Sequence, residues 1–170
     1  MLAFAAFALV LVSSADPVAL FNGKNLDGWR EASRDKASLA GKTEAFGGRF
    51  KVIDGVLVID PAVKGDLYIE TEKTFPGDLR IIIEFKPGPK CNNDVFIRGT
   101  KFDLVPGGKE GMNLKVGESA TCEIVIKGDV IEHRLNSESV RRAKAKPAPT
   151  SLRIRAEFGS MEIKSIQLLP

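Results

Sequence analysis

Three carboxylates are candidates for proton transfer, because each lies in a short segment whose charged and apolar residues alternate. Glu72 ends the segment LYIETE, Glu84 lies in LRIIIEFK, and Asp103 lies in KFDLV. A carboxylate acts as a general acid or base when its surroundings bring its pKa close to the working pH. The plainer interpretation of Glu72, and equally of Glu84, is a surface charge paired with a lysine.

An arginine, Arg98, lies shortly before Asp103 in the sequence. The segment CNNDVFIRG, residues 91–99, contains three turn-forming residues, Asn92-Asn93-Asp94, followed by an apolar run that ends at Arg98. Arginine offers a rigid fork of donors that suits sugar hydroxyls or a carboxylate. We predict that Arg98 faces a ligand, with Asp103 as its acid partner if 94–98 and 101–105 form a hairpin. A structural salt bridge is the alternative role of Arg98.

These side chains gather on one surface only if the segments are strands, since successive side chains of a strand point to opposite faces. Short runs rich in Val, Ile and Phe recur along the chain, and Gly, Pro, Asn and Asp interrupt them. This pattern is typical of an all-β sandwich of two antiparallel sheets. We predict strands over 18–21, 49–53, 56–60, 67–72, 78–86, 94–98, 101–105, 120–127, 130–135, 139–142, 151–158 and 161–169.

Turn dipeptides join several of these strands. Asp54-Gly55 and Gly128-Asp129 tolerate positive φ and predict tight hairpins, and Asn136-Ser137 is a weaker third turn. Only 31–40 could form a helix, and it could equally be a loop. Several strands then carry long charged side chains on one face. That face is either a groove lined with Glu and Arg or the ordinary solvent face of an antiparallel sheet.

The composition favours one folded domain of ordinary size. The chain has 170 residues, of which 28% are charged and 44% apolar, and its net charge is +3 from 25 basic and 22 acidic residues. This near balance argues against nucleic acid as the partner. The basic residues crowded at 141–146 are predicted to form a solvated loop.

The N-terminal segment MLAFAAFALVLVSSADP predicts export. Its apolar run, 2–12, is too short to cross a bilayer, and small residues follow it. We therefore predict a signal peptide over 1–15 and a single β-sandwich domain over 16–170. No later run is long or apolar enough to span a membrane, and we expect a soluble, exported and monomeric protein, secreted or periplasmic.

Cysteine, histidine and tryptophan are scarce, and each has two interpretations. Cys91 and Cys122 are the only cysteines, and export makes a disulfide between them possible, with two buried free thiols as the alternative. The only histidine, His133, cannot complete a Cys/His metal set with them, so we expect no metal or other cofactor. His133 alternates with apolar residues, which favours a packed side chain over a titrating one. Trp29 either anchors the N-terminal strand or stacks on a sugar.

Six segments, in this order, resemble the 3-keto-disaccharide hydrolase domain family. The resemblance runs from about residue 19 to 169, and the segments read LFNGKNLDGWR, FKVIDGVLVID, YIETEKTFPGDLRIIIEFK, NNDVFIRG, EIVIKGDVIEHRLNSESV and IRAEFGSMEIKSIQL. The resemblance implies a concanavalin-like, jelly-roll β-sandwich in a secreted bacterial protein that acts on carbohydrate. It implies cleavage of glycosides oxidised at carbon 3, where the ketone acidifies the hydrogen at carbon 2.

The resemblance also assigns roles to particular residues. Glu72 matches the family's threonine–glutamate strand, and Asp103 takes the acidic place of a later strand. Asn93 stands at the family's asparagine–serine–glycine position, while Arg155 and Glu157 match its polar closing strand. Together with Glu84, which shares the polar face of the next strand, and with Arg98, these residues give the candidate sets: Glu72, Glu84 and Asp103 for catalysis, and Arg98, Asn93, Arg155 and Glu157 for substrate binding.

The sequence also departs from the family pattern. Asn93-Asp94, or Asn92-Asn93 under a shifted alignment, replaces a serine–glycine pair, and a long loop that the family carries after residue 105 is shortened to KEGMNLKVGES. Two functions therefore stay open. One is a glycoside hydrolase or lyase with a groove on the concave sheet, and the other is a carbohydrate-binding module of the same fold without catalysis.

Overall fold

The computed structural model describes residues 16–169, which form a sandwich of strands that contains no helix. The strands are β1 (Val18–Ala19), β2 (Trp29–Glu31), β3 (Glu44–Ala45), β4 (Phe50–Ile53), β5 (Val56–Ile59), β6 (Leu67–Thr71), β7 (Leu79–Pro87), β8 (Asn92–Ile97), β9 (Thr100–Asp103), β10 (Ala120–Lys127), β11 (Val130–Leu135), β12 (Glu138–Lys144), β13 (Arg153–Phe158) and β14 (Met161–Leu169).

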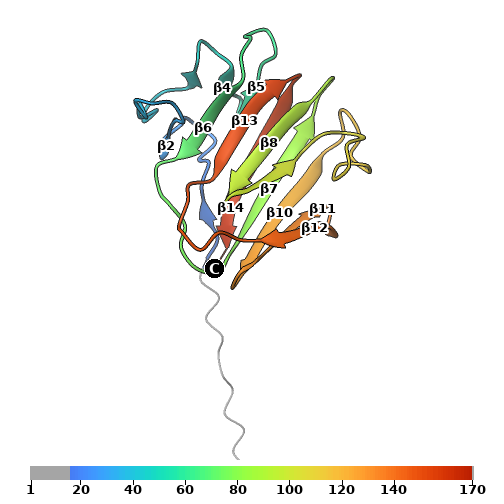
Figure 1. Cartoon of the computed structure of the whole chain (residues 1–170). Coiled ribbons are helices and arrows are strands. Elements are labelled where there is room, and N and C mark those ends of the chain that lie inside the picture. The colour runs from blue at the N-terminus through green and yellow to red at the C-terminus, as the bar shows by residue number, and fades with distance from the viewer. Residues whose placement is uncertain (1–15, 170) are drawn as a thin grey trace, which may run out of the picture.

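Two antiparallel sheets make up the sandwich (Figure 1). The larger sheet has the order β12-β11-β10-β7-β14-β5-β4-β3, and β1 pairs with β14. The smaller, five-stranded sheet has the order β2-β6-β13-β8-β9. Neighbours in each sheet are often distant in sequence, as β7 and β14 are. The predicted fold class, a concanavalin-like β-sandwich, is confirmed.

The core follows from the alternation along the strands. In β7 the residues Leu79, Ile81, Ile83 and Phe85 are buried, while the residues between them are partly or fully exposed. The five-stranded sheet contributes Ile69, Val95, Phe102, Ile154 and Ala156 to the same core. Burying these side chains stabilises the fold by roughly 25 cal/mol per Å² of apolar surface.

The hairpin turns have the backbone that their sequences predict. Asp54 and Gly55 both have positive φ, 49° and 83°, and so do Asn136 and Ser137, at 49° and 72°. Two positive φ values in a two-residue turn match the right-handed twist of the paired strands. These turns set the registers of β4 with β5 and of β11 with β12.

Most predicted strands are confirmed, and the differences have local causes. The strands β2 and β3 were not predicted because segments of two or three residues leave no alternation to detect. Residues 31–40 form a loop, closed by a bridge between Arg30 and Ser38, rather than a helix. The strand predicted over 94–98 begins earlier, because the turn-forming residues Asn92 and Asn93 belong to β8, and it ends at Ile97. The predicted signal peptide lies outside the described residues, and within them no helix could cross a membrane.

Candidate functional site

The outward side of the five-stranded sheet, called here the outer face, carries the densest group of charged and aromatic side chains. It is formed by Arg30, Tyr68, Glu70, Asp94, Phe96, Lys101, Asp103, Arg153, Arg155 and Glu157, which alternate with core residues along five strands. Cross-strand register makes them neighbours: Arg155 of β13 stands opposite Tyr68 on one side and Asp94 on the other.

Glu70 is held between two arginines. Arg30 Nε donates a hydrogen bond of 2.9 Å to its carboxylate, and Arg153 Nη2 donates another of 2.7 Å. Burial acts to raise the pKa of Glu70, but the hydrogen bonds from Arg153 and Arg30 outweigh it and hold the pKa below its usual range. This carboxylate therefore stays charged and fixes both guanidinium groups in place.

Arg155 connects three carboxylates. Its Nε and Nη2 each donate a hydrogen bond of 2.7 Å to Asp66, and its Nη1 lies 3.1 Å from Asp94 and 2.6 Å from Glu157. The hydrogen bonds to Asp66 and Asp94 raise the pKa of Arg155 far above its usual range, so the side chain is always a cation. The prediction that Arg155 and Glu157 belong to one polar surface is confirmed by these contacts.

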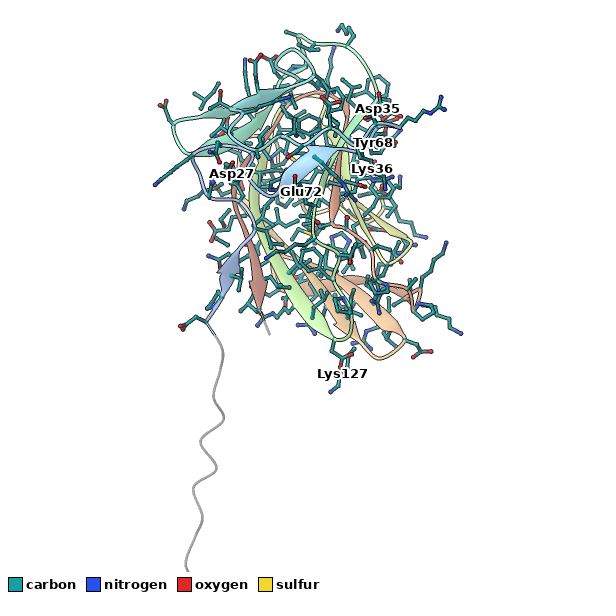
Figure 2. All side chains as sticks on the ribbon, turned by 90° about the vertical axis from the view of Figure 1, so that its left-hand side faces the viewer. Asp27, Asp35, Lys36, Tyr68, Glu72 and Lys127 are labelled. Atoms are coloured by element: carbon teal, nitrogen blue, oxygen red, sulfur yellow. The ribbon has the colours of Figure 1, made fainter. Side chains whose placement is uncertain are left out.

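Two aromatic rings lie among these charges. The ring centroids of Tyr68 and Phe96 are 6.1 Å apart, and the guanidinium carbons of Arg153 and Arg155 lie 5.8 and 5.7 Å from the centre of the Tyr68 ring. Figure 2 shows Tyr68 on the same side of the molecule as Asp35, in the 31–40 loop. Aromatic faces beside fixed donors are the elements that bind a sugar ring, through its C–H groups and its hydroxyls.

Asp94 and Asp103 form a pair of carboxyl groups on β8 and β9. They stand opposite each other in the register, and Lys101 Nζ lies 2.7 Å from Asp103 Oδ1. The Asp94 side chain is 0% exposed, and as a carboxylate its Oδ1 atom has no hydrogen-bond donor among residues 16–169. When one of the two carboxyl groups is protonated, Asp94 can form a hydrogen bond with Asp103.

The two members of this pair differ in acidity. Burial, with the hydrogen bond to Asp103, raises the pKa of Asp94 to about 6. Burial acts in the same direction on Asp103, but hydrogen bonds from Lys101 and Asp94 outweigh it and lower the pKa of Asp103. Two carboxyl groups with separated pKa values are the arrangement expected of an acid–base pair. Asp103, whose side chain is 28% exposed, is the member that solvent and ligands reach.

The other two predicted catalytic carboxylates do not join this pair. Glu72 follows the end of β6, where it is exposed and accepts a hydrogen bond of 2.6 Å from Ser38 Oγ at the β2 edge (Figure 2). Glu84 lies on β7 in the other sheet, 48% exposed, with Lys164 Nζ 3.5 Å away. The expectation that Glu72, Glu84 and Asp103 line one groove is therefore wrong, because alternation fixes the face of a strand and not its sheet.

Two predicted substrate-binding residues are buried. Arg98 lies in the turn after β8 with a φ of 52°, is 4% exposed, and donates a hydrogen bond to the Phe75 carbonyl oxygen at 3.1 Å. Asn93 points into the sandwich, where its Oδ1 accepts from the Glu157 amide at 3.0 Å, at the bulge between β8 and β13. Both side chains stabilise loops and strands and offer no surface to a ligand.

The possible disulfide does not form. Cys91 and Cys122 are both free and buried. Cys91 Sγ donates to the Leu104 carbonyl oxygen at 3.4 Å, before β8 of the smaller sheet, whereas Cys122 lies on β10 of the larger sheet. The two thiols belong to opposite layers of the sandwich.

His133 is a packed side chain, as the alternation predicts, and it lies between a carboxylate and a thiol in the protein interior. Its Nδ1 lies 2.8 Å from Glu110, and its Nε2 lies 3.5 Å from Cys122 Sγ. The order thiol, imidazole, carboxylate resembles a nucleophilic triad. Yet Cys122 and His133 are both 0% exposed, and burial strongly raises the pKa of the thiol, so Cys122 is held neutral and inaccessible.

Asp94 is a member of the candidate site that the sequence analysis does not name as a site residue. Asp94 begins the strand predicted over 94–98, but as the last of three turn-forming residues, Asn92-Asn93-Asp94, it was not singled out for a role. One signal was available. Asp94, Phe96 and Arg98 are two residues apart, so in a strand they point to the same face, and this places Asp94 on the polar face. Among residues 16–169 no group of three or more His, Cys, Asp or Glu side chains is arranged to hold a metal ion.

The model of the 3-keto-alpha-glucoside-1,2-lyase-like domain matches residues 16–113, more than half of the chain. The chain belongs to this family. The matched region includes β6 and the Asp94–Asp103 pair, whereas β13, with Arg155, lies beyond it. No curated protein matches the chain.

Solved structures share the fold at low sequence identity. A protein from Parabacteroides distasonis that is named as a glycosyl hydrolase has a TM-score of 0.64 and 16% identity, with 89% of this chain and 92% of that chain covered. The carbohydrate binding module CBM66 from Bacillus subtilis has a TM-score of 0.57 and 10% identity, with 84% and 96% covered. The carbohydrate recognition domain of Emp47p has a TM-score of 0.56 and 10% identity, with 89% and 92% covered. The domain therefore has a fold that occurs in both glycosyl hydrolases and carbohydrate-binding proteins.

Proposed function

We propose that this domain binds a glycoside over the outer face and cleaves it by elimination next to a 3-keto group. The observation that carries the proposal is the Asp94–Asp103 pair, two opposed carboxyl groups whose pKa values are displaced in opposite directions beside a lysine. Membership of a lyase-like family supports the same chemistry. We also propose that the protein works outside the cytoplasm, where such glycans occur, in line with the predicted signal peptide.

The proposed step needs one base and one acid. Asp103 takes the proton from carbon 2 of the 3-keto sugar, and the C–H electrons form a double bond between carbons 1 and 2. The bond from carbon 1 to the leaving oxygen then breaks, and the ammonium group of Lys101, 2.7 Å from Asp103, gives that oxygen a proton. Transfer of the proton from Asp103 to Lys101 restores both groups. Asp94 acts as a positioning residue that holds the charge of Asp103 in place.

Binding without cleavage is the second candidate function, and a specific observation favours it. The charged groups of the outer face are largely bound to one another: Glu70 contacts two arginines, Arg155 contacts three acids, and Asp103 contacts Lys101. Such a network preorganises donors around Tyr68 and Phe96 and leaves few groups free for proton transfer. The same fold serves recognition in CBM66 and in the domain of Emp47p.

The deciding test compares the wild-type protein with Asp103→Asn on 3-keto-glucosides that carry a chromogenic leaving group. We expect the wild type to release the group and Asp103→Asn to lose at least about 100-fold of the rate. Binding of the same compound, measured by calorimetry, should change little, because asparagine keeps the size of the side chain.

A matched control and a pH profile complete this test. Glu72→Gln removes an exposed carboxylate at the edge of the same sheet and should leave the rate unchanged. Release by the wild type should depend on a group that titrates near pH 6, and this dependence should disappear in Asp94→Asn. Binding without any release by the wild type would reject the enzyme and establish the binding module.

A further inference from the structure

A cleft at one end of the sandwich adjoins the outer face. It has a volume of about 930 Å³ and lies between the loops that follow β5, β7 and β13, at the upper end of Figure 1. Its lining includes residues 60–66, Lys90 and Phe158, and also Arg49, the residue before β4. We call this space the end cleft.

The acidic side chains of the end cleft are already neutralised. Asp60 lies 2.5 Å from Lys51 Nζ, while Asp66 and Glu157 both contact Arg155 at 2.7 and 2.6 Å. Lys51 and Arg155 are not part of the cleft lining. Each acid therefore has a cation on a sheet strand; the Asp60 carboxylate also attracts Arg49 but forms no salt bridge with it.

Three cations of the end cleft, Arg49, Lys64 and Lys90, form no salt bridge with any residue in 16–169. Lys64 and Lys90 are exposed and need no partner. Arg49 is different, because it is only 2% exposed and its Nη1 donates to a backbone oxygen of Asp60 at 2.8 Å, while its Nε has no acceptor within 16–169. A buried cation with an unused donor is costly unless an anion completes its hydrogen bonds.

An exposed aromatic ring lies in the same cleft. Phe158 is 61% exposed, at the end of β13, two residues from Ala156 and its core contacts. A large apolar ring in water marks a binding surface when it lies beside convergent polar groups. The face of a sugar ring packs on an aromatic ring, while the polar substituents of the sugar reach neighbouring donors.

We propose that the end cleft binds a sugar unit that carries an anionic group, a carboxylate or a sulfate. The anion pairs with Arg49 between Lys64 and Lys90, and the sugar ring packs on Phe158. The cleft is continuous with the outer face because Asp66 and Glu157, which line it, are the residues that hold Arg155. This inference rests on the proposed function in one respect, that the ligand is a carbohydrate, and it holds whether or not the glycoside is cleaved.

The test measures binding of three sets of oligosaccharides by calorimetry at low salt. Oligogalacturonates carry carboxylates, their methyl esters are neutral, and sulfated galactan oligosaccharides carry sulfates. We expect at least one charged set to bind the wild type about tenfold tighter than the methyl esters. Preference for the first or the third set identifies the anion as a carboxylate or a sulfate.

Four variants locate the binding. Lys64→Gln combined with Lys90→Gln, Phe158→Ala, and Arg49→Gln should each lower the affinity for the charged set about tenfold. Lys127→Gln, which removes another exposed lysine at the opposite end of the molecule (Figure 2), should leave that affinity unchanged. If Arg49→Gln fails to fold, the exposed substitutions at Lys64, Lys90 and Phe158 decide the matter.

The outcomes separate this inference from the proposed function. Equal binding of charged and neutral sets, or an equal loss in Lys127→Gln, overturns the end-cleft site while binding at the outer face stands. If the wild type binds none of the three sets and no 3-keto-glucoside, both proposals fail. If the end-cleft variants keep the rate of 3-keto-glucoside release but lose the charged ligand, both are supported as separate sites.

Discussion

The outer face and the outward side of the larger sheet arise from the same kind of sequence, yet their charges behave differently. On β7 and β14, Glu84, Lys86, Glu162 and Lys164 form two separate pairs of 3.5 and 2.6 Å, and all four side chains are at least 40% exposed. We call this group the Glu84 patch. On the outer face, Glu70 and Asp94 are almost fully buried by the cations and aromatic rings around them.

The difference comes from the partners on adjacent strands. Glu70 has an arginine on both neighbouring strands, and Arg155 has acids on its own strand and on β8. Each carboxylate in the Glu84 patch has one lysine and open water. Charges that share partners across three strands exclude water and shift one another's pKa values, whereas isolated pairs are screened by solvent. Function therefore depends on register, which brings together residues that are far apart in sequence.

Arg155→Ala should cause the largest loss of stability, because it disrupts the shared contacts that distinguish the outer face from the Glu84 patch. It removes the cation that contacts Asp66, Asp94 and Glu157, and it leaves Asp94 buried with its nearest cation, Lys101 Nζ, 3.9 Å away. We expect a loss of about 2 to 4 kcal/mol in the free energy of unfolding, because an unpaired buried carboxylate is costly. Urea denaturation at pH 7 measures it.

The matched variant for this measurement is Arg153→Ala. Arg153 also lies on β13 and faces outward, but Glu70 keeps Arg30 as a second partner when Arg153 is removed. Its loss should be clearly smaller than that of Arg155→Ala. Equal losses would mean that the three-acid contact of Arg155 has no special weight.

Asp94→Asn should have the next largest effect, and it should depend on pH. The pKa of Asp94 is raised from 3.8 to about 6 in the folded protein. Between these values the unfolded chain has released a proton that the folded chain keeps. The stabilisation of the folded state by this proton is therefore complete below about pH 4 and is lost as the pH rises to 6. Relative to Asp94→Asn, the wild type should therefore lose about 1 to 3 kcal/mol between pH 4 and pH 7.

Asp60→Asn is a control of opposite sign for the pH measurement. The hydrogen bond from Lys51 lowers the pKa of Asp60, so its contribution is present above the unfolded pKa and is lost as the pH falls through the folded pKa. Relative to Asp60→Asn, the wild type should gain stability as the pH rises from acid towards 7. Urea denaturation of both variants across this range gives the two slopes, and slopes of equal sign would contradict the assignment of Asp94.

Much of the fold could be predicted from the sequence, because its signals are local. The predicted strands at 120–127, 130–135 and 161–169 have the observed bounds, since alternation and turn residues define them. Arg98 was misplaced because its positive φ ends the alternation one residue after β8. Glu84 was misplaced because nothing local says which sheet receives β7.

The candidate site was predicted only in part, for the same physical reason. Asp103, Arg155 and Glu157 were placed on the polar face through parity and the family resemblance, and they do lie together. Their central partner, Asp94, has a turn-like sequence and becomes chemically distinct only through burial between β13 and β9. Burial by distant strands is a property of the tertiary structure, and single-strand patterns do not contain it.

Glu84→Gln should have the smallest effect. The side chain is 48% exposed and its one cation, Lys164 Nζ, is 3.5 Å away, so the free energy of unfolding should change by less than about 0.5 kcal/mol. Release from 3-keto-glucosides should also stay at the wild-type rate, because Glu84 lies on the other sheet from Asp103. A loss of that rate with unchanged stability would move the active site to the Glu84 patch. The network of the outer face would then be a structural device that stabilises the smaller sheet.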